Sequence, residues 1–163
     1  MPDQMTTTLT EVFSEVLSDL AFLFTDEDAV ETTEDDLWLE TVIGYQGSQS
    51  GALRLRCTRR FSILLAANLL GADPEDADAE DSADDAVKEF MNIVCGQFVT
   101  AVHGTKDVFQ LTIPQIAELP GPPDLSGCDG GNSSRMTVEG QPVQLTNLSG
   151  AVDAPTFDEN ASV

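Results

Sequence analysis

The chain has 163 residues, of which 41% are hydrophobic, so it is long enough for one domain with a substantial core. It carries 29 acidic and 7 basic side chains, a formal net charge of −22 that disfavours nucleic acid and anionic membrane surfaces as partners. The sequence has neither an apolar run of roughly 18 residues nor a basic N-terminal segment before an apolar run, which predicts a cytoplasmic protein without a signal peptide or a membrane span. The acidic surplus fits either a partner with a basic rim or a generally acidic proteome.

The chain begins with a predicted helix and a β-hairpin. Residues 7–24 repeat apolar side chains at helical spacing, and an acidic loop over 25–36 follows. Two strands then flank a turn at 46–50, because 37–45 is rich in β-forming residues and 53–57 alternates leucine or cysteine with arginine. The side chains of the first helix expected to face inward are Val12, Phe13, Val16, Leu17, Leu20 and Phe24.

Two further helices are predicted in the middle of the chain. Residues 59–70 form a short amphipathic helix that ends at Gly71. The segment 73–85 is acidic and rich in alanine, and from about Ser82 a longer helix runs to His103. We expect Ser82 to help to cap that helix, together with the acidic charges near its positive end.

The rest of the chain predicts three strands and two irregular segments. These are a strand over 109–113 that stops at Pro114, a loop over 121–134, a hairpin of 136–138 and 143–148 around Gly140, and a loose tail over 150–163. The order of elements lacks the strand–helix alternation of doubly wound folds. We therefore expect an α+β fold, an antiparallel sheet with helices packed on one face, as one domain over 1–149.

A polar stripe marks the long helix. At about 100° per residue, Asp85, Glu89, Asn92 and Gly96 fall within a band roughly 60° wide. A glycine inside a helix costs about 1 kcal/mol relative to alanine, and the close approach of another molecule would explain it. On spacing alone, a solvated helix face is the more common explanation of such a stripe. The apolar side chains expected on the opposite side are Val87, Phe90, Met91, Val94, Phe98 and Ala101.

This helix resembles a known signature. Residues 85–92 read DAVKEFMN and residues 93–96 read IVCG, which is similar to the signature helix of the CheX/CheC/FliY chemotaxis phosphatases. That signature has Asp or Ser, three residues, Glu, two residues and Asn, followed about twenty-two residues later by a proline. Pro114 follows Asn92 with twenty-one residues between them. The order of elements over most of 7–148 fits the family as well, which implies a CheC-like α/β sandwich.

The resemblance implies a role for each matching residue. The activity would be hydrolysis of the aspartyl phosphate on a CheY-type response regulator. Asn92 would orient the attacking water, and Glu89 would pair with a lysine of the regulator beside the phosphate. Asp85 and Pro114 would shape or support the helix, and Gly96 would leave room for the docking partner. The chain would need no metal or cofactor of its own, because the magnesium is expected in the regulator's active site.

The first helix indicates which branch of the family the chain resembles. CheC-like members carry a second Glu-x-x-Asn there, whereas this chain has serine at both candidate positions, Ser14 and Ser18. One motif per chain resembles CheX, whose members form homodimers. The rival hypothesis is a non-catalytic module of the same fold that binds a receiver domain or another protein.

Other kinds of site have weaker support. Asp78, Glu80, Ser82 and Glu89 are spaced like calcium ligands, but Ala83 stands where the loop needs glycine. The single histidine, His103, and the widely spaced Cys57, Cys95 and Cys128 do not form a zinc pattern, and the thiols are expected to be reduced. The four arginines at positions 54, 56, 59 and 60 could meet an acidic face of a partner, but we expect them to balance local acids on an exposed hairpin face.

Overall fold

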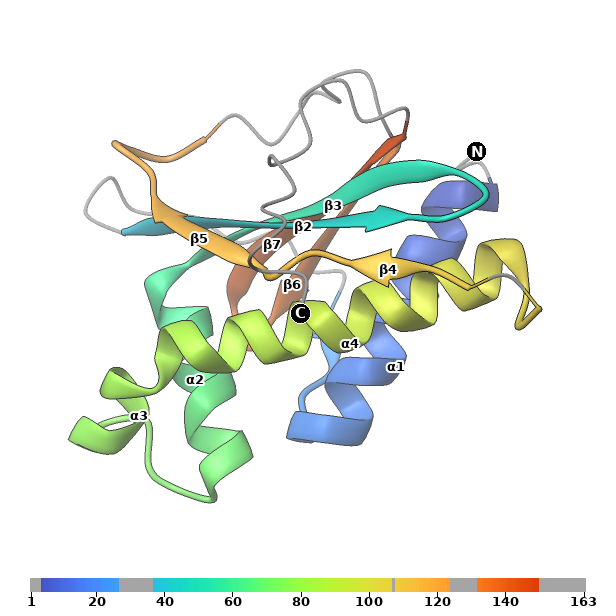
Figure 1. Cartoon of the computed structure of the whole chain (residues 1–163). Helices are drawn as coiled ribbons and strands as arrows, with labels where there is room; N and C mark the ends of the chain where they lie inside the picture. Colours follow the sequence, from blue (N-terminus) through green and yellow to red (C-terminus); the bar gives the residue numbers. More distant parts are fainter. Residues whose placement is uncertain (1–3, 27–36, 107, 124–131, 150–163) are drawn as a thin grey trace.

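The computed structural model describes residues 4–26, 37–106, 108–123 and 132–149 (Figure 1). The helices are α1 (Gln4–Ala21), α2 (Arg59–Leu70), α3 (Ala77–Asp81) and α4 (Ala83–His103). The strands are β1 (Thr25–Asp26), β2 (Trp38–Gln46), β3 (Ser50–Thr58), β4 (Gln110–Leu111), β5 (Gln115–Glu118), β6 (Asn132–Val138) and β7 (Gln141–Ser149). The acidic loop was predicted over 25–36, but its first two residues form β1, and 27–36 lie outside the described residues, as does the predicted tail over 150–163.

The strands form one antiparallel sheet in the order β1-β6-β7-β3-β2-β4, with β5 also pairing to β2. The helices lie together on one face of this sheet, below it in Figure 1. The α+β fold with helices on one face is therefore confirmed. The predicted hairpin is formed by β2 and β3, with Ile43 opposite Leu53 and Leu39 opposite Cys57.

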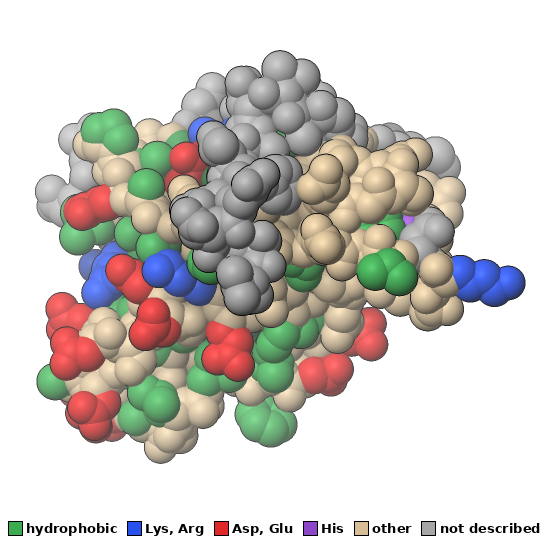
Figure 2. Space-filling model, viewed as in Figure 1, with side chains coloured by type: hydrophobic (Ala, Val, Ile, Leu, Met, Phe, Trp, Pro, Cys, Tyr) green, Lys and Arg blue, Asp and Glu red, His purple; other side chains and the backbone are tan. Residues whose placement is uncertain are grey.

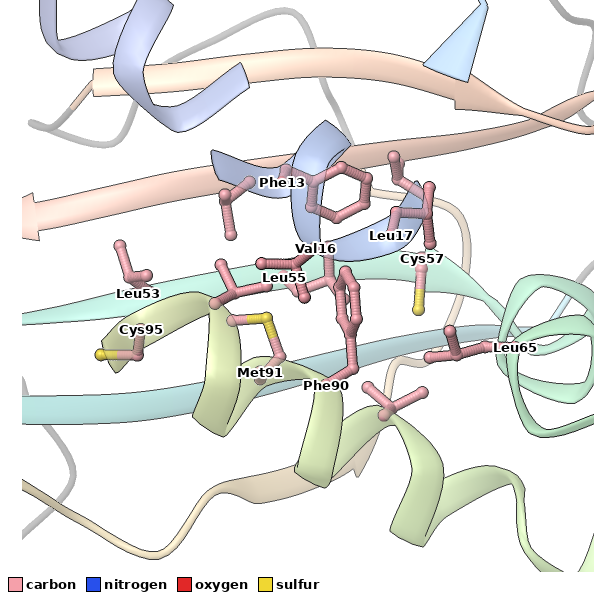
Figure 3. Packing of buried hydrophobic residues seen from close by; sticks show 14 of the residues in the cluster. Phe13, Val16, Leu17, Leu53, Leu55, Cys57, Leu65, Phe90, Met91 and Cys95 are labelled. Carbon is pink, nitrogen blue, oxygen red and sulfur yellow. The ribbon is translucent and has the colours of Figure 1, made fainter. Parts of the chain in front are cut away.

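The core lies between the helices and the inner face of the sheet. Alternate residues of β3 point into it, because successive side chains of a strand project to opposite faces. Figure 3 shows Leu53, Leu55 and Cys57 of β3 pointing toward Phe90 and Met91 of α4, with side chains of α1 above them. Aromatic rings join three helices here: Phe13 packs edge-on against Phe90 at 5.3 Å and lies 6.5 Å from Phe61, between ring centroids.

Helix α2 begins and ends where the sequence predicts. Thr58 caps its start, since the side-chain oxygen accepts a hydrogen bond from the backbone N–H of Phe61 at 3.2 Å. Gly71 ends it in the left-handed conformation, with φ of 67°. By contrast, Ser82 makes no side-chain cap bond at the start of α4, so that expectation is wrong. Its backbone N–H instead closes α3 on the carbonyl of Asp78.

The outer face of the hairpin differs from the prediction. Arg54 is buried and Arg56 half-buried, although we expected an exposed face. Both arginines do balance a local acid, because their Nε atoms lie 3.5 and 3.1 Å from the Glu40 carboxylate. Glu40 stands directly opposite Arg56 in the ladder, the position at which opposite charges stabilise a sheet.

Several elements are shorter than predicted or were not predicted. The strand expected over 109–113 is confined to β4, while α3 and β5 have too few apolar residues to show a period. β6 begins at Asn132, inside the predicted loop, because its polar side chains are satisfied by pairing. Ser133 shares a hydrogen bond with Thr146 at 2.9 Å, and Ser134 shares one with Thr10 of α1.

In the part of the chain that the structure describes, none of the helices combines the length and the apolar character needed to cross a bilayer.

Candidate functional site

The buried side chains of helix α4 form two rows, and within each row every fourth residue is buried. The first row is Ala83, Val87, Met91, Cys95 and Val99, and the second is Ala86, Phe90, Val94 and Phe98. A repeat of four advances about 40° around the helix at each turn, since one turn takes 3.6 residues. The buried band therefore winds around α4 along its length. For this reason Ala101, which we expected in the core, is exposed.

The polar stripe lies on the opposite face of α4. Asp85, Glu89 and Asn92 are exposed, and Gly96 follows one turn after Asn92. A Cβ atom added to Gly96 would meet nothing within 4 Å, so the glycine leaves open space. The structure thus places the four predicted residues together on one outward face.

The carboxylate of Glu89 and the amide of Asn92 are available to a partner. Neither side chain has a hydrogen bond or an ion pair with any residue in the described ranges, and one helical turn separates them. A carboxylate attracts a cation, and a neutral amide both donates and accepts hydrogen bonds. Such a pair can hold a basic group and orient a water molecule.

The start of α4 is tied to α2. The Nη1 atom of Arg59 donates to the Asp84 carboxylate at 2.7 Å, and its Nη2 atom donates to the backbone carbonyl of Glu80 at 3.2 Å. Asp84 and Asp85 stand in the first turn of α4, where negative charge complements the helix dipole. These contacts fix the corner between α3 and α4 and with it the direction of the stripe.

A hollow of about 530 Å³ lies beside this corner, with Leu37, Leu39 and Ile116 among its apolar side chains and Arg59 and Asp84 among its charged ones. The sequence could not predict it, because its walls come from segments far apart in the chain.

Pro114 does not join the stripe. It lies on the edge of the sheet, in the short connection between β4 and β5. Thr112, two residues earlier, keeps this edge against β2: its backbone N–H donates to the Gly44 carbonyl at 2.9 Å, and its hydroxyl accepts from the Gly44 N–H at 2.7 Å. A proline fits the break between the strands, since it has no N–H to donate.

Two cysteines are unsuited to nucleophilic chemistry. Cys57 and Cys95 are buried free thiols. Burial raises the pKa of each thiol from 9.0 to about 12, and at Cys57 the charge of Asp84 is a smaller cause. A thiol of that pKa stays protonated at neutral pH and is a poor nucleophile and a poor metal ligand. Cys128 lies outside the described residues.

The calcium pattern is spread over separate elements. Asp78 and Glu80 lie in α3, whereas Glu89 lies on the exposed face of α4. Across the described ranges, no three His, Cys, Asp or Glu side chains are grouped as a metal ion would require. The ring of His103, in the last turn of α4, packs on Phe109 at 5.0 Å.

Comparison with known proteins points to one family. The family model described as chemotaxis phosphatase CheX matches residues 40–121, which include the whole of α2 and α4 with the polar stripe. No curated protein sequence matches the chain.

Solved structures share the fold over nearly the whole chain. CheX from Desulfovibrio desulfuricans has a TM-score of 0.66 at 16% identity, covering 90% of this chain and 99% of that chain. CheX from Vibrio vulnificus has a TM-score of 0.65 at 17% identity, covering 90% and 97%. The CheX–CheY–BeF3–Mg2+ complex from Borrelia burgdorferi matches with a TM-score of 0.61 at 18% identity, covering 88% and 96%. At these identities the similarities show the fold.

Proposed function

We propose that this chain, which belongs to the CheX family of chemotaxis phosphatases, hydrolyses the aspartyl phosphate of a CheY-type receiver domain. The observation that carries the proposal is the exposed face of α4, where Glu89 and Asn92 stand one turn apart and Gly96 leaves room beside them. A partner can reach both side chains without any rearrangement of the helix.

Asn92 is the residue we assign to catalysis. Hydrolysis of an acyl phosphate needs a water held in line with the bond to phosphorus, and positioning supplies most of the rate increase. The Asn92 amide can hold that water through its oxygen or its NH2 group. Because the amide is neutral, it does not repel the phosphoryl oxygens as a carboxylate would.

Glu89 is assigned to docking. Its carboxylate projects from the same face one turn before Asn92, where a basic side chain beside the receiver's phosphate can pair with it. Such a pair fixes the distance between Asn92 and the phosphorus atom. Asp85 adds negative charge one turn earlier, and Pro114 supports the sheet edge that runs alongside α4.

A related complex supports the choice of partner. The structure from Borrelia burgdorferi contains CheX together with CheY, BeF3 and Mg2+. We extend this kind of partner to the present chain, with the magnesium held by the receiver. No acid, thiol or histidine of the chain then has to act as a ligand or a nucleophile.

Variants of α4 test the two assignments. Asn92→Ala should lower the turnover number for a phosphorylated CheY-type receiver by at least about a hundredfold and leave binding unchanged. Glu89→Gln should mainly raise KM, because it removes charge pairing and not the water contact. The matched control is Gln97→Ala, which removes an exposed amide about 140° around the same helix from Asn92.

The control should keep full activity. If Asn92→Ala hydrolyses the receiver phosphate as fast as the unmodified chain, the assignment of Asn92 is wrong. If the unmodified chain binds the phosphorylated receiver without accelerating its dephosphorylation, the chain is a receiver-binding module and not a phosphatase.

A further inference from the structure

Helix α4 contains one lysine and no arginine, and this lysine, Lys88, lies beside the polar stripe. Lys88 precedes Asn92 by four residues, which places it about 6 Å back along the helix axis and about 40° around it. Residues four apart are neighbours on a helix surface, with about 5–6 Å between their Cβ atoms. A group that docks directly over Asn92 therefore comes within reach of the Lys88 side chain.

The charge of Lys88 is available to a partner. Lys88 makes no hydrogen bond or ion pair with any residue in the ranges that the structure describes. Its side chain is half-buried, and a lysine of this kind lays its methylene groups along the protein surface and keeps its ammonium group in water. The acid one turn earlier, Asp84, is paired with Arg59 at 2.7 Å instead. The ion pair at the start of α4 thus leaves the lysine unneutralised.

Lys88 is a cation in acidic surroundings. The chain has 29 acidic and 7 basic side chains, and Figure 2 shows acidic ones scattered over the lower, helical half of the molecule with few basic ones among them. In the stripe itself Asp85 and Glu89 are negative, and an acyl phosphate is negative as well. The stripe alone would repel the group that Asn92 has to reach. A positive charge one turn before Asn92 offsets this repulsion.

Lys88, Asn92 and Gly96 follow one another at intervals of four residues and form one row along α4. Side chains of a helix lean toward its N-terminus, so the amide of Asn92 leans toward Lys88. On the other side of Asn92 there is open space, because a Cβ atom on Gly96 would meet nothing within 4 Å. A phosphoryl group can therefore lie between Lys88 and Asn92 while the space at Gly96 admits the body of the receiver.

We propose that Lys88 is a further catalytic residue, whose ammonium group binds the phosphoryl oxygens of the receiver while Asn92 holds the water. This inference rests on the proposed function, since it takes its substrate from there. The water oxygen bonds to phosphorus as the bond from phosphorus to the aspartate oxygen breaks. The products are the receiver's carboxylate and dihydrogen phosphate, which keeps both protons of the water. Lys88 transfers no proton and stabilises the charge on the phosphoryl oxygens in the transition state.

Lys88→Met tests the proposal, because it removes the charge and keeps the length of the side chain. Methionine and lysine have similar helix propensities, so the melting temperature should not change. The turnover number for a phosphorylated CheY-type receiver should fall by about tenfold with little change in KM, since the lost contact is strongest in the transition state. Lys88→Arg should retain most of the turnover. Steady-state phosphate release measures both quantities.

Lys106→Met is the matched control, since it changes the net charge by the same amount. Lys106 is exposed and lies beyond the end of α4, more than about 16 Å along the helix from Asn92. This variant should keep full turnover.

Full turnover in Lys88→Met, a rise in KM alone, or an equal loss in Lys106→Met would overturn the proposal. If Lys88→Met keeps full turnover while Asn92→Ala is inactive, the phosphatase function stands and only the role of Lys88 is refuted. A chain that accelerates dephosphorylation of none of the receivers refutes both.

Discussion

Gly96 affects both the stability of α4 and the access of a partner to the polar stripe. Because a Cβ atom there meets nothing, Gly96→Ala should raise the free energy of unfolding by about 1 kcal/mol through helix propensity alone. Chemical denaturation measures this change, and Ala101→Gly, at an exposed position of the same helix, should give a loss of similar size. Gly96→Phe should fold equally well but bind the receiver poorly, because the ring fills the space beside Asn92. A destabilised Gly96→Ala would contradict the open geometry.

The sequence predicted the polar stripe better than the buried band. Asp85, Glu89 and Asn92 stay outward because they fall between the two buried rows, on the side of the helix away from both. Ala101 was placed wrongly, since an ideal wheel ignores the winding that packing against α1, α2 and β2 imposes. Phe24 was also expected to be inward, but the helix ends at Ala21 and the chain turns its ring to solvent.

At the scale of elements, the ion pair of Arg59 and Asp84 holds the start of α4. Both side chains are partly exposed, so a double-mutant cycle of Arg59→Ala and Asp84→Ala should give a coupling energy of about 0.2–1 kcal/mol. Arg59→Ala also removes the bond to the Glu80 carbonyl. Hydrogen exchange should then quicken over 77–87 and stay unchanged over 94–102. Equal acceleration in both segments would mean that Arg59 stabilises the whole domain and not this corner.

The elements with strong local signals were predicted from the sequence, and those made by tertiary contacts were not. Helix α2 has Thr58 and Gly71 at its ends and was predicted with the limits that it has. The pairing of β2 with β3 was predicted as well, although both strands run further toward the turn. β5 has one large apolar residue among four, and it forms because its backbone pairs with that of β2. The cap expected at Ser82 failed because its backbone, with φ of −97° and ψ of 1°, lacks the extended conformation from which a cap side chain reaches the N–H groups of the next helix.

At the scale of the whole molecule, two buried thiols and one buried phenol limit the stability of the fold at alkaline pH. Burial raises the pKa of Cys57 and Cys95 from 9.0 to about 12. Burial and then the charge of Cys95 raise that of Tyr45 from 10.0 to about 12, against the opposing hydrogen bond to Asn147. The unfolded chain ionises first, so stability is complete below about pH 9 and is lost as pH rises toward 12.

Melting temperatures measured between pH 8 and pH 11 test this limit. Each thiol should lower the free energy of unfolding by about 1.4 kcal/mol for every pH unit above 9. The double variant Cys57→Ala, Cys95→Ala is less stable at pH 8 because of its cavities, but its stability should fall less steeply with pH. An identical slope in the variant and the unmodified chain would show that these thiols do not govern the alkaline loss.

The overall arrangement followed from the order of elements, but the surfaces did not. Helix, hairpin, two helices and later strands were enough to predict an antiparallel sheet covered on one side. The hollow beside Asp84 was missed because it joins residues distant in the chain. The homodimer implied by the family resemblance stays a prediction, since the structure contains one chain.

The central claim is that Asn92 and Glu89 of α4 make this chain a phosphatase. The most direct test follows phosphate release from a phosphorylated CheY-type receiver, with the chain present at about one-hundredth of the receiver concentration. Release is expected to become faster in proportion to the amount of chain, so that each molecule acts on many receivers in turn. A rate equal to the receiver's own dephosphorylation, with every receiver tested and at any amount of chain, would contradict it.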